Sequence, residues 1–159
     1  MRHATVARLT SSIYGTVLAI ALIAAYSAEE SLDPILIDAA LLVTLGVFWL
    51  AHSQAELLAV RYAVGHPLTR AETREHLRHG LPMVEAGLPP AATLMLGAIG
   101  LVSDDTSVSL ALAVGVAELG AWGIAVGAKE KLGTLRTIGV TAVNVSLGLA
   151  VVGLKLLIH

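Results

Sequence analysis

Two side chains with complementary chemistry, His52 and Glu56, are four residues apart in the sequence. In a helix this spacing places both on one face, with Trp49 one turn earlier on the same face. An imidazole beside a carboxylate can take up and release protons near neutral pH. The pair can also chelate a divalent cation if other helices complete the site. The pattern therefore predicts a proton relay or part of a metal site. The alternative is two polar head groups in water at a membrane surface.

Glu118 lies near the middle of a long apolar segment, with alanine and glycine at most neighbouring positions. A carboxylate at membrane depth costs several kcal/mol unless it is paired or hydrated, which makes it a candidate functional group. Its expected partners come from other helices: His52, Asn144 or a protonated Glu85. We interpret Glu118 as a transport or gating residue. The alternative is a protonated carboxyl group that links helices by a hydrogen bond.

Glu85 precedes the Pro89-Pro90 pair by four residues. Both prolines lack the amide hydrogens that the carbonyl groups of Glu85 and Ala86 would otherwise accept. Free carbonyl groups beside a carboxylate are typical of cation sites at broken helices in transporters. A simple helix kink is the alternative interpretation.

These residues define two overlapping candidate sites. The candidate transport pathway comprises Glu118, Glu85, His52, Glu56, Asn144 and Tyr14. The candidate divalent-metal site comprises His52, Glu56, Glu85 and Glu118. Counted from the basic ends of their segments, the four metal candidates lie about 0 to 15 Å deep. Because the opposite halves of the segments are almost wholly apolar, we expect a polar vestibule closed by an apolar plug.

Composition indicates that these residues are placed by membrane helices. Hydrophobic residues make up 56% of the 159 residues and charged residues 14%, and the mean hydropathy is +0.80. Spans of about 20 residues would use most of such a chain. The sequence therefore predicts an all-α, single-domain bundle of five transmembrane helices. The expected spans cover residues 10–28, 34–60, 82–102, 106–128 and 137–158.

The charges between these segments predict an orientation. Acidic connections (Glu29, Glu30 and Asp33; Asp104 and Asp105) alternate with basic ones. Nine of the ten lysines and arginines fall on one side, and Lys155 is the exception. The positive-inside rule makes the basic side cytoplasmic, so we expect the N-terminus inside and the C-terminus outside.

The connection after the second segment predicts a short cytoplasmic helix over residues 69–79. Thr69 and Glu72 have the spacing of a capping box, and Gly80 with Pro82 ends the helix. Arg70, Arg74 and Arg78 recur every four residues and would face anionic lipid headgroups. We therefore expect an interfacial helix, in which His66, His76 and His79 could titrate or bind metal.

For the first apolar segment a cleaved signal peptide is the alternative interpretation. Arg2 and Arg8 precede it, and Ala25-Tyr26-Ser27 resembles a cleavage site.

Several classes of protein lack support in the sequence. The chain has no cysteine, which excludes disulfides, thiolate metal sites and iron–sulfur clusters. A Walker A loop, H-E-x-x-H and G-x-S-x-G are all missing, so ATP-driven transport, zincin chemistry and serine-hydrolase chemistry are not indicated. A net charge of -2 gives no reason to expect a nucleic-acid partner.

The stretch from Val47 to His52, continuing to Ala55-Glu56-Leu57-Leu58, and the Tyr14-Gly15 pair resemble small integral membrane proteins of actinobacteria. The resemblance implies a multi-pass protein of the bacterial plasma membrane and transfers no activity.

Three functions remain open from the sequence. The leading hypothesis is a homo-oligomeric channel or transporter for protons or small cations, without a cofactor. The second is a membrane protein or enzyme that binds a divalent metal. The third is a non-catalytic membrane partner whose carboxylates only link helices.

Overall fold

The structure, a computed structural model, describes residues 2–27 and 33–158. In this part of the chain every regular element is a helix: α1 (Arg2–Tyr26), α2 (Pro34–Val64), α3 (Arg70–Gly80), α4 (Pro82–Glu85), α5 (Leu88–Ala98), α6 (Asp104–Lys129) and α7 (Thr134–Ile158). Glu29 and Glu30 lie outside the described residues, and so does the side chain of Lys155. The all-α prediction is confirmed.

Four of the helices are long and apolar enough to cross a membrane: Val6–Tyr26, Pro34–Val64, Asp104–Lys129 and Thr134–Gly153. Large apolar side chains, such as Val43, Ile124 and Val143, are more than half exposed on their outer faces. Exposed apolar faces on such helices are suited to contact with lipid, because their exposure to water would be unfavourable in free energy. The chain is therefore a membrane protein.

The span predicted over residues 82–102, in which Pro89 and Pro90 indicated a break or a kink, is divided in the structure. α4 ends at Glu85, and α5 begins at Leu88 with Pro89 and Pro90 in its first turn. The prolines cannot continue the hydrogen bonding of α4, so the helix is interrupted at Ala86-Gly87. α5 then ends at Ala98, before Gly100 takes a left-handed φ of 74°.

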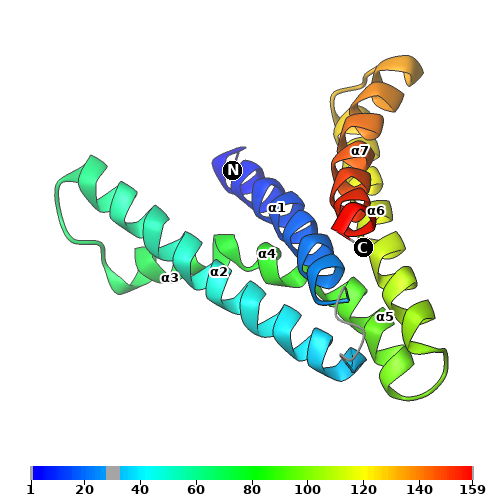
Figure 1. Cartoon of the computed structure of the whole chain (residues 1–159). Helices are drawn as coiled ribbons and strands as arrows, with labels where there is room; N and C mark the ends of the chain where they lie inside the picture. Colours follow the sequence, from blue (N-terminus) through cyan, green and yellow to red (C-terminus); the bar gives the residue numbers. More distant parts are fainter. Residues whose placement is uncertain (1, 28–32, 159) are drawn as a thin grey trace.

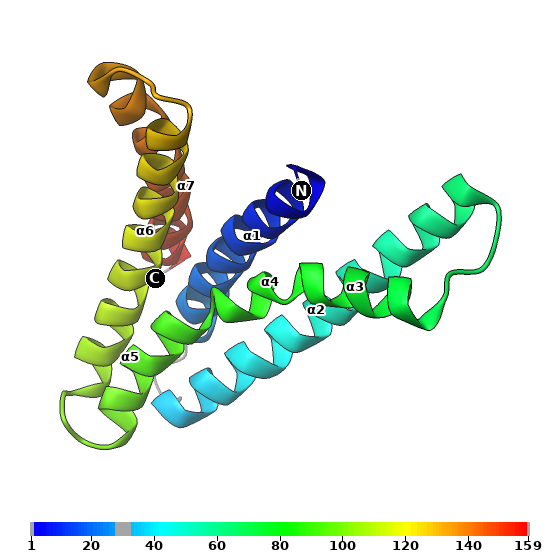
Figure 2. The ribbon, with the colours of Figure 1, turned by 180° about the vertical axis from the view of Figure 1, so that it is seen from behind.

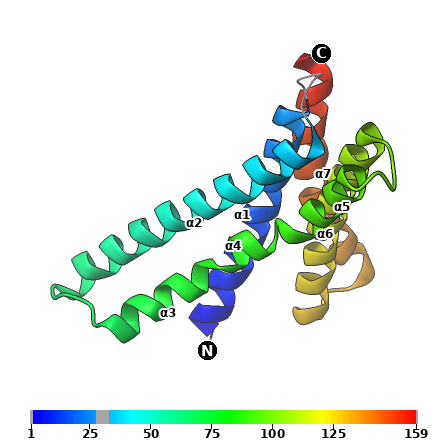
Figure 3. The same cartoon turned by 90° about the horizontal axis from the view of Figure 1, so that it is seen from below.

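α2 has 31 residues, which corresponds to about 46 Å at 1.5 Å per residue, well beyond the hydrocarbon core of a bilayer. Its start lies beside the end of α5, since Pro34 is close to Gly97. After Gly65, α3 turns back along the end of α2, as Figure 3 shows. We call the end of α2 from Trp49 onward, together with α3, the α2–α3 arm.

α3 itself agrees with the sequence in its bounds and its cap. The Thr69 hydroxyl accepts a hydrogen bond from the Glu72 amide, and the Glu72 carboxylate accepts one from the Thr69 amide at 2.8 Å. Arg70, Arg74 and Arg78 are exposed, as expected for a basic surface.

α1 lies at the centre of the bundle and contacts α2, α4, α6 and α7 (Figure 1). Ile20 and Ile23 in its second half are fully buried with Leu41 and Leu45 of α2. Leu94 of α5 and Ala111, Leu112 and Leu119 of α6 complete this core. Apart from Leu119, near the middle of α6, these residues lie in the half of the bundle away from Arg8 and Lys129. We call the end that carries Arg8 and Lys129 the basic end.

α6 and α7 form an antiparallel hairpin that departs from the rest of the bundle towards the basic end (Figure 2). Gly123 and Gly127 of α6 lie against Thr141 and Thr137 of α7 so closely that an added Cβ would collide with them. The Gly123-x-x-x-Gly127 pair therefore serves helix packing, as its spacing predicts. The alanines Ala113, Ala117, Ala121 and Ala125 of the same helix are exposed.

Candidate functional site

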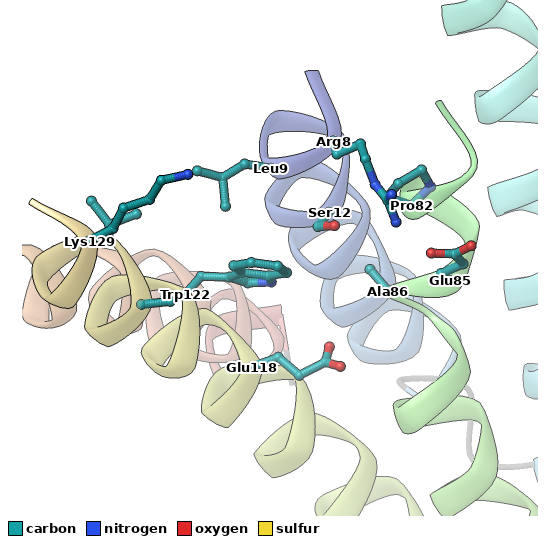
Figure 4. Close-up of a pocket in the computed structure, with 11 residues that line it drawn as sticks. Arg8, Leu9, Ser12, Pro82, Glu85, Ala86, Glu118, Trp122 and Lys129 are labelled. Atoms are coloured by element: carbon teal, nitrogen blue, oxygen red, sulfur yellow. The ribbon is translucent and has the colours of Figure 1, made fainter. Parts of the chain in front are cut away.

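A cavity of about 580 Å³ lies between α1, α4 and α6, at the basic end of the bundle. Each helix contributes polar and apolar lining residues. They are Arg8, Leu9 and Ser12 of α1; Pro82, Glu85 and Ala86 of α4 and the residue after it; and Glu118, Trp122, Ala125, Val126 and Lys129 of α6. Figure 4 shows Glu85 and Glu118 on opposite walls of this cavity.

Close backbone packing forms one wall of the cavity. Gly15 of α1 lies directly against the backbone of Met83 in α4, and a Cβ at this position would overlap the Met83 carbonyl group. Glycine is required here for steric reasons, because any side chain would push the two helices apart. The contact holds Glu85, two residues further along, at the cavity.

Glu118 lies at the inner limit of the cavity and is half-buried. The buried Thr16 hydroxyl of α1 donates a hydrogen bond to Glu118 Oε2 at 3.4 Å and one to the Ser12 carbonyl at 3.0 Å. A hydroxyl group has one hydrogen to share, so the longer bond to Glu118 is the weaker one. Glu118 is thus held loosely from α1 and is free to interact with a cavity ligand.

The apolar core begins next to Glu118 and Thr16. Leu119 follows it in α6 and is fully buried, and Ala19 and Ile20 follow Thr16 in α1 and are also fully buried. The cavity therefore extends from the basic end to Glu118 and Thr16, and packed apolar side chains lie beyond them.

Two basic side chains, Arg8 and Lys129, are exposed at the mouth of the cavity. Lys129 is eleven residues from Glu118 along α6, which corresponds to about 16 Å. This separation is too large for a direct ion pair between Lys129 and Glu118. In Figure 4, Arg8 extends towards α4, near Pro82.

Glu56, in contrast, belongs to the α2–α3 arm. Its Oε1 atom lies 3.4 Å from Nδ1 of His76, and the His76 ring meets that of His79 edge-on at 6.2 Å between centroids. Trp49, on the same helix, donates a hydrogen bond from Nε1 to the Leu77 carbonyl at 3.0 Å. These contacts fasten α3 to α2 and lie apart from the cavity.

The other sequence candidates also lie outside the cavity lining. His52 is exposed on α2, Tyr14 is 49% exposed on α1, and Asn144 is half-buried on α7. Of the residues in the predicted pathway, Glu85 and Glu118 line the same cavity. Between residues 2–27 and 33–158 no group of three or more histidine, aspartate or glutamate side chains is arranged to hold a metal ion.

The sequence places Thr16 in the same polar layer as the candidate residues but does not pair it with Glu118, and it assigns no role to Trp122. Trp122 follows Glu118 by four residues, the same helical spacing that singled out His52 and Glu56. This spacing was a usable signal. The pairing of Thr16 with Glu118 joins residues 102 positions apart, and no local pattern encodes it.

Comparison of the chain with protein families, curated proteins and solved structures gave no match.

Proposed function

We propose that this protein is a proton- or small-cation transporter in which Glu118 is the ion-carrying group. The observation that carries the proposal is the position of Glu118. It is a carboxylate within an apolar helix, at the inner limit of a cavity that opens at one end of the bundle. Carboxylates at membrane depth mark ion pathways and proton relays in known membrane proteins.

The arrangement favours a transporter over an open channel. Polar groups line the cavity as far as Glu118, and the buried core residues Ile20, Leu94 and Leu119 follow. A site that is open on one side and closed by packed side chains on the other fits alternating access, in which the bundle rearranges around the bound ion. The interruption at Ala86-Gly87, beside Glu85, supplies a broken helix of the kind that lines transporter sites.

The proposal includes a topology of five crossings, with α4 and α5 together as the third. α5 runs antiparallel to α2 along its first half, which supports a crossing between the loop at Gly65 and the turn at Gly100. The positive-inside rule places the basic end in the cytoplasm and, with the resemblance, the protein in a bacterial plasma membrane. The exposed alanine face of α6 supports close contact with a second copy, so the homo-oligomer remains part of the proposal.

Proton flux into liposomes tests the function. Purified protein is reconstituted with a pH-sensitive dye inside the vesicles, and flux is recorded under an imposed potential, with Na⁺ and K⁺ flux measured in parallel. We expect Glu118→Gln to lower the flux at least about tenfold, because the amide cannot carry a proton.

Glu56→Gln is the matched control, since Glu56 has the same neighbours in sequence, Ala55 and Leu57, and lies outside the cavity. This variant should conduct like the wild type. Equal flux through wild-type and Glu118→Gln protein, or no flux from folded wild-type protein at any pH, would contradict the proposal.

A further inference from the structure

The cavity is larger and more varied in chemistry than an inorganic ion requires. Its volume of about 580 Å³ falls within the range of about 300–1,000 Å³ that is typical of small-molecule sites. Besides its charged groups it is lined by Leu9, Pro82, Ala86, Ala125 and Val126. An apolar lining with a few charged groups suits an organic molecule of moderate size.

Glu118 and Trp122 give this cavity a preference for positive charge. They are one helical turn apart in α6, and both side chains line the cavity (Figure 4). An aromatic face attracts a cation at up to about 6 Å from its centre, most strongly where water is excluded, and indole is the best of the aromatic groups. A carboxylate and an indole on the same wall can therefore act together on one organic cation.

The remaining charged groups that line the cavity with Glu118 are Arg8 from α1, Glu85 from α4 and Lys129 from α6. Arg8 and Lys129 are exposed at the basic end, where lipid phosphate groups would neutralise them. Glu85 adds a second negative charge on the wall opposite Glu118. Glu85 is itself exposed, so the inner part of the cavity carries the Glu118 carboxylate and the Trp122 indole, whereas its exposed rim carries Arg8, Lys129 and Glu85.

We propose, on the basis of the transport function above, that the cavity binds a lipophilic organic cation in exchange for the proton of Glu118. The protonated carboxyl group releases its hydrogen ion to water, and the resulting carboxylate pairs with the organic cation. One positive charge replaces another, so the cavity keeps its charge. Because one carboxylate serves both ligands, the two compete, and this competition is what couples their movement in opposite directions.

Binding of tetraphenylphosphonium to the purified protein in detergent tests the inference. This cation is lipophilic and has no proton of its own, so any proton released comes from the protein. We expect saturable binding by calorimetry, with empty micelles subtracted. The titration is repeated in two buffers of different ionisation enthalpy, because the difference in observed binding enthalpy gives the number of protons released. At a pH where Glu118 is protonated, we expect about one proton released per bound cation. The apparent affinity should rise with pH as the competing proton is removed.

Variants separate the two binding groups. Glu118→Gln should abolish proton release and weaken binding at least about tenfold, because the counter-charge is lost. Trp122→Leu should weaken binding about three- to tenfold, while Trp122→Phe stays near the wild type because the aromatic face is kept. Glu56→Gln should bind normally. If circular dichroism shows that Glu118→Gln does not fold, the comparison of Trp122→Leu with Trp122→Phe still tests whether the cation binds in the cavity.

Three outcomes would overturn the inference: no saturable binding by wild-type protein, binding without proton release, or equal affinity in the Trp122→Leu and Trp122→Phe variants. Glu118-dependent proton flux without binding of the cation would overturn the exchange and leave the proposed function standing. Binding with proton release but without flux would support the organic-cation site and remove the transport function.

Discussion

The tripeptide Ala-Glu-Leu occurs twice in this molecule, as Ala55-Glu56-Leu57 and as Ala117-Glu118-Leu119, and the two copies have different surroundings. In both tripeptides the leucine is buried and the glutamate is half-buried. Glu56 faces a histidine of the α2–α3 arm, whereas Glu118 faces a buried threonine and a cavity. The local sequence is the same, so the role of each carboxylate is set by the helices around it.

The two regions are also held together by different forces. Glycine at position 15 lets α1 and α4 meet backbone to backbone beside the cavity. The α2–α3 arm depends on polar contacts, including the indole of Trp49 on a backbone carbonyl and the pair of Glu56 and His76. Close packing needs no water and suits lipid, while hydrogen bonds between polar groups are sensitive to solvent and pH.

The largest effect is expected from a substitution that disrupts only the packing of α1 against α4 beside the cavity. Gly15→Ala places a methyl group into the Met83 carbonyl, and we expect a loss of about 2–3 kcal/mol in the free energy of unfolding, as for an overpacked core. Thermal unfolding in detergent, followed by circular dichroism, measures it. Gly46→Ala in α2 is the control, because no atom lies within 4 Å of the added Cβ. It should be neutral or stabilising by up to about 1 kcal/mol through helix propensity. Equal behaviour of the two variants would mean that α1 and α4 do not touch.

A smaller effect is expected from a substitution that weakens the contact between α2 and α3 in the arm and leaves the cavity unchanged. Trp49→Phe removes the donor to the Leu77 carbonyl and should cost about 1 kcal/mol of local stability, the usual contribution of one hydrogen bond. Amide hydrogen exchange should become about fivefold faster across α3, with no change in α6. Trp122→Phe, the matched control, should leave exchange in α3 unchanged. Faster exchange throughout the protein would show that the arm and the cavity unfold as one unit.

The smallest effect concerns the tip of the arm in acid. Hydrogen bonds from the Thr69 amide and hydroxyl hold the pKa of Glu72 below its ordinary value of 4.5. Since the folded pKa is the lower one, this carboxylate stabilises α3 above pH 4.5, and the contribution is lost as the pH falls through the folded pKa. Exchange at the start of α3 should therefore accelerate below about pH 4.5, after correction for intrinsic rates. Glu72→Gln, which keeps a capping side chain, should show no such acid dependence. An acid response that persists in this variant would assign it to another group.

The sequence predicted much of this fold because its signals are local. The apolar segments and the capping box at Thr69 and Glu72 both correspond to features of the structure. The division of the segment after Pro82 was partly foreseeable, since Pro89 and Pro90 cannot donate to Glu85 and Ala86. α2 continues four residues beyond its predicted end at residue 60, and the return of α3 along it was not predicted.

The candidate site was harder to predict because it depends on which helices are neighbours. His52 and Glu56 share a face of α2, but that end of α2 belongs to the arm, away from Glu118. The position of α1 between α4 and α6 decides that Arg8 and Ser12 line the cavity, that Thr16 bonds Glu118, and that Asn144 does neither. No periodicity within one helix carries this information.

The junction between α3 and α4 has a mechanical consequence. Leu81, between the two helices, has φ and ψ of -52° and -36°, which are right-handed helical values, so the backbone keeps a helical course from Arg70 to Glu85. The cavity wall that carries Glu85 is therefore the direct backbone continuation of α3. A force applied to α3 in water, by a lipid surface or another protein, would be transmitted along the backbone to the cavity without any side chain serving as a relay.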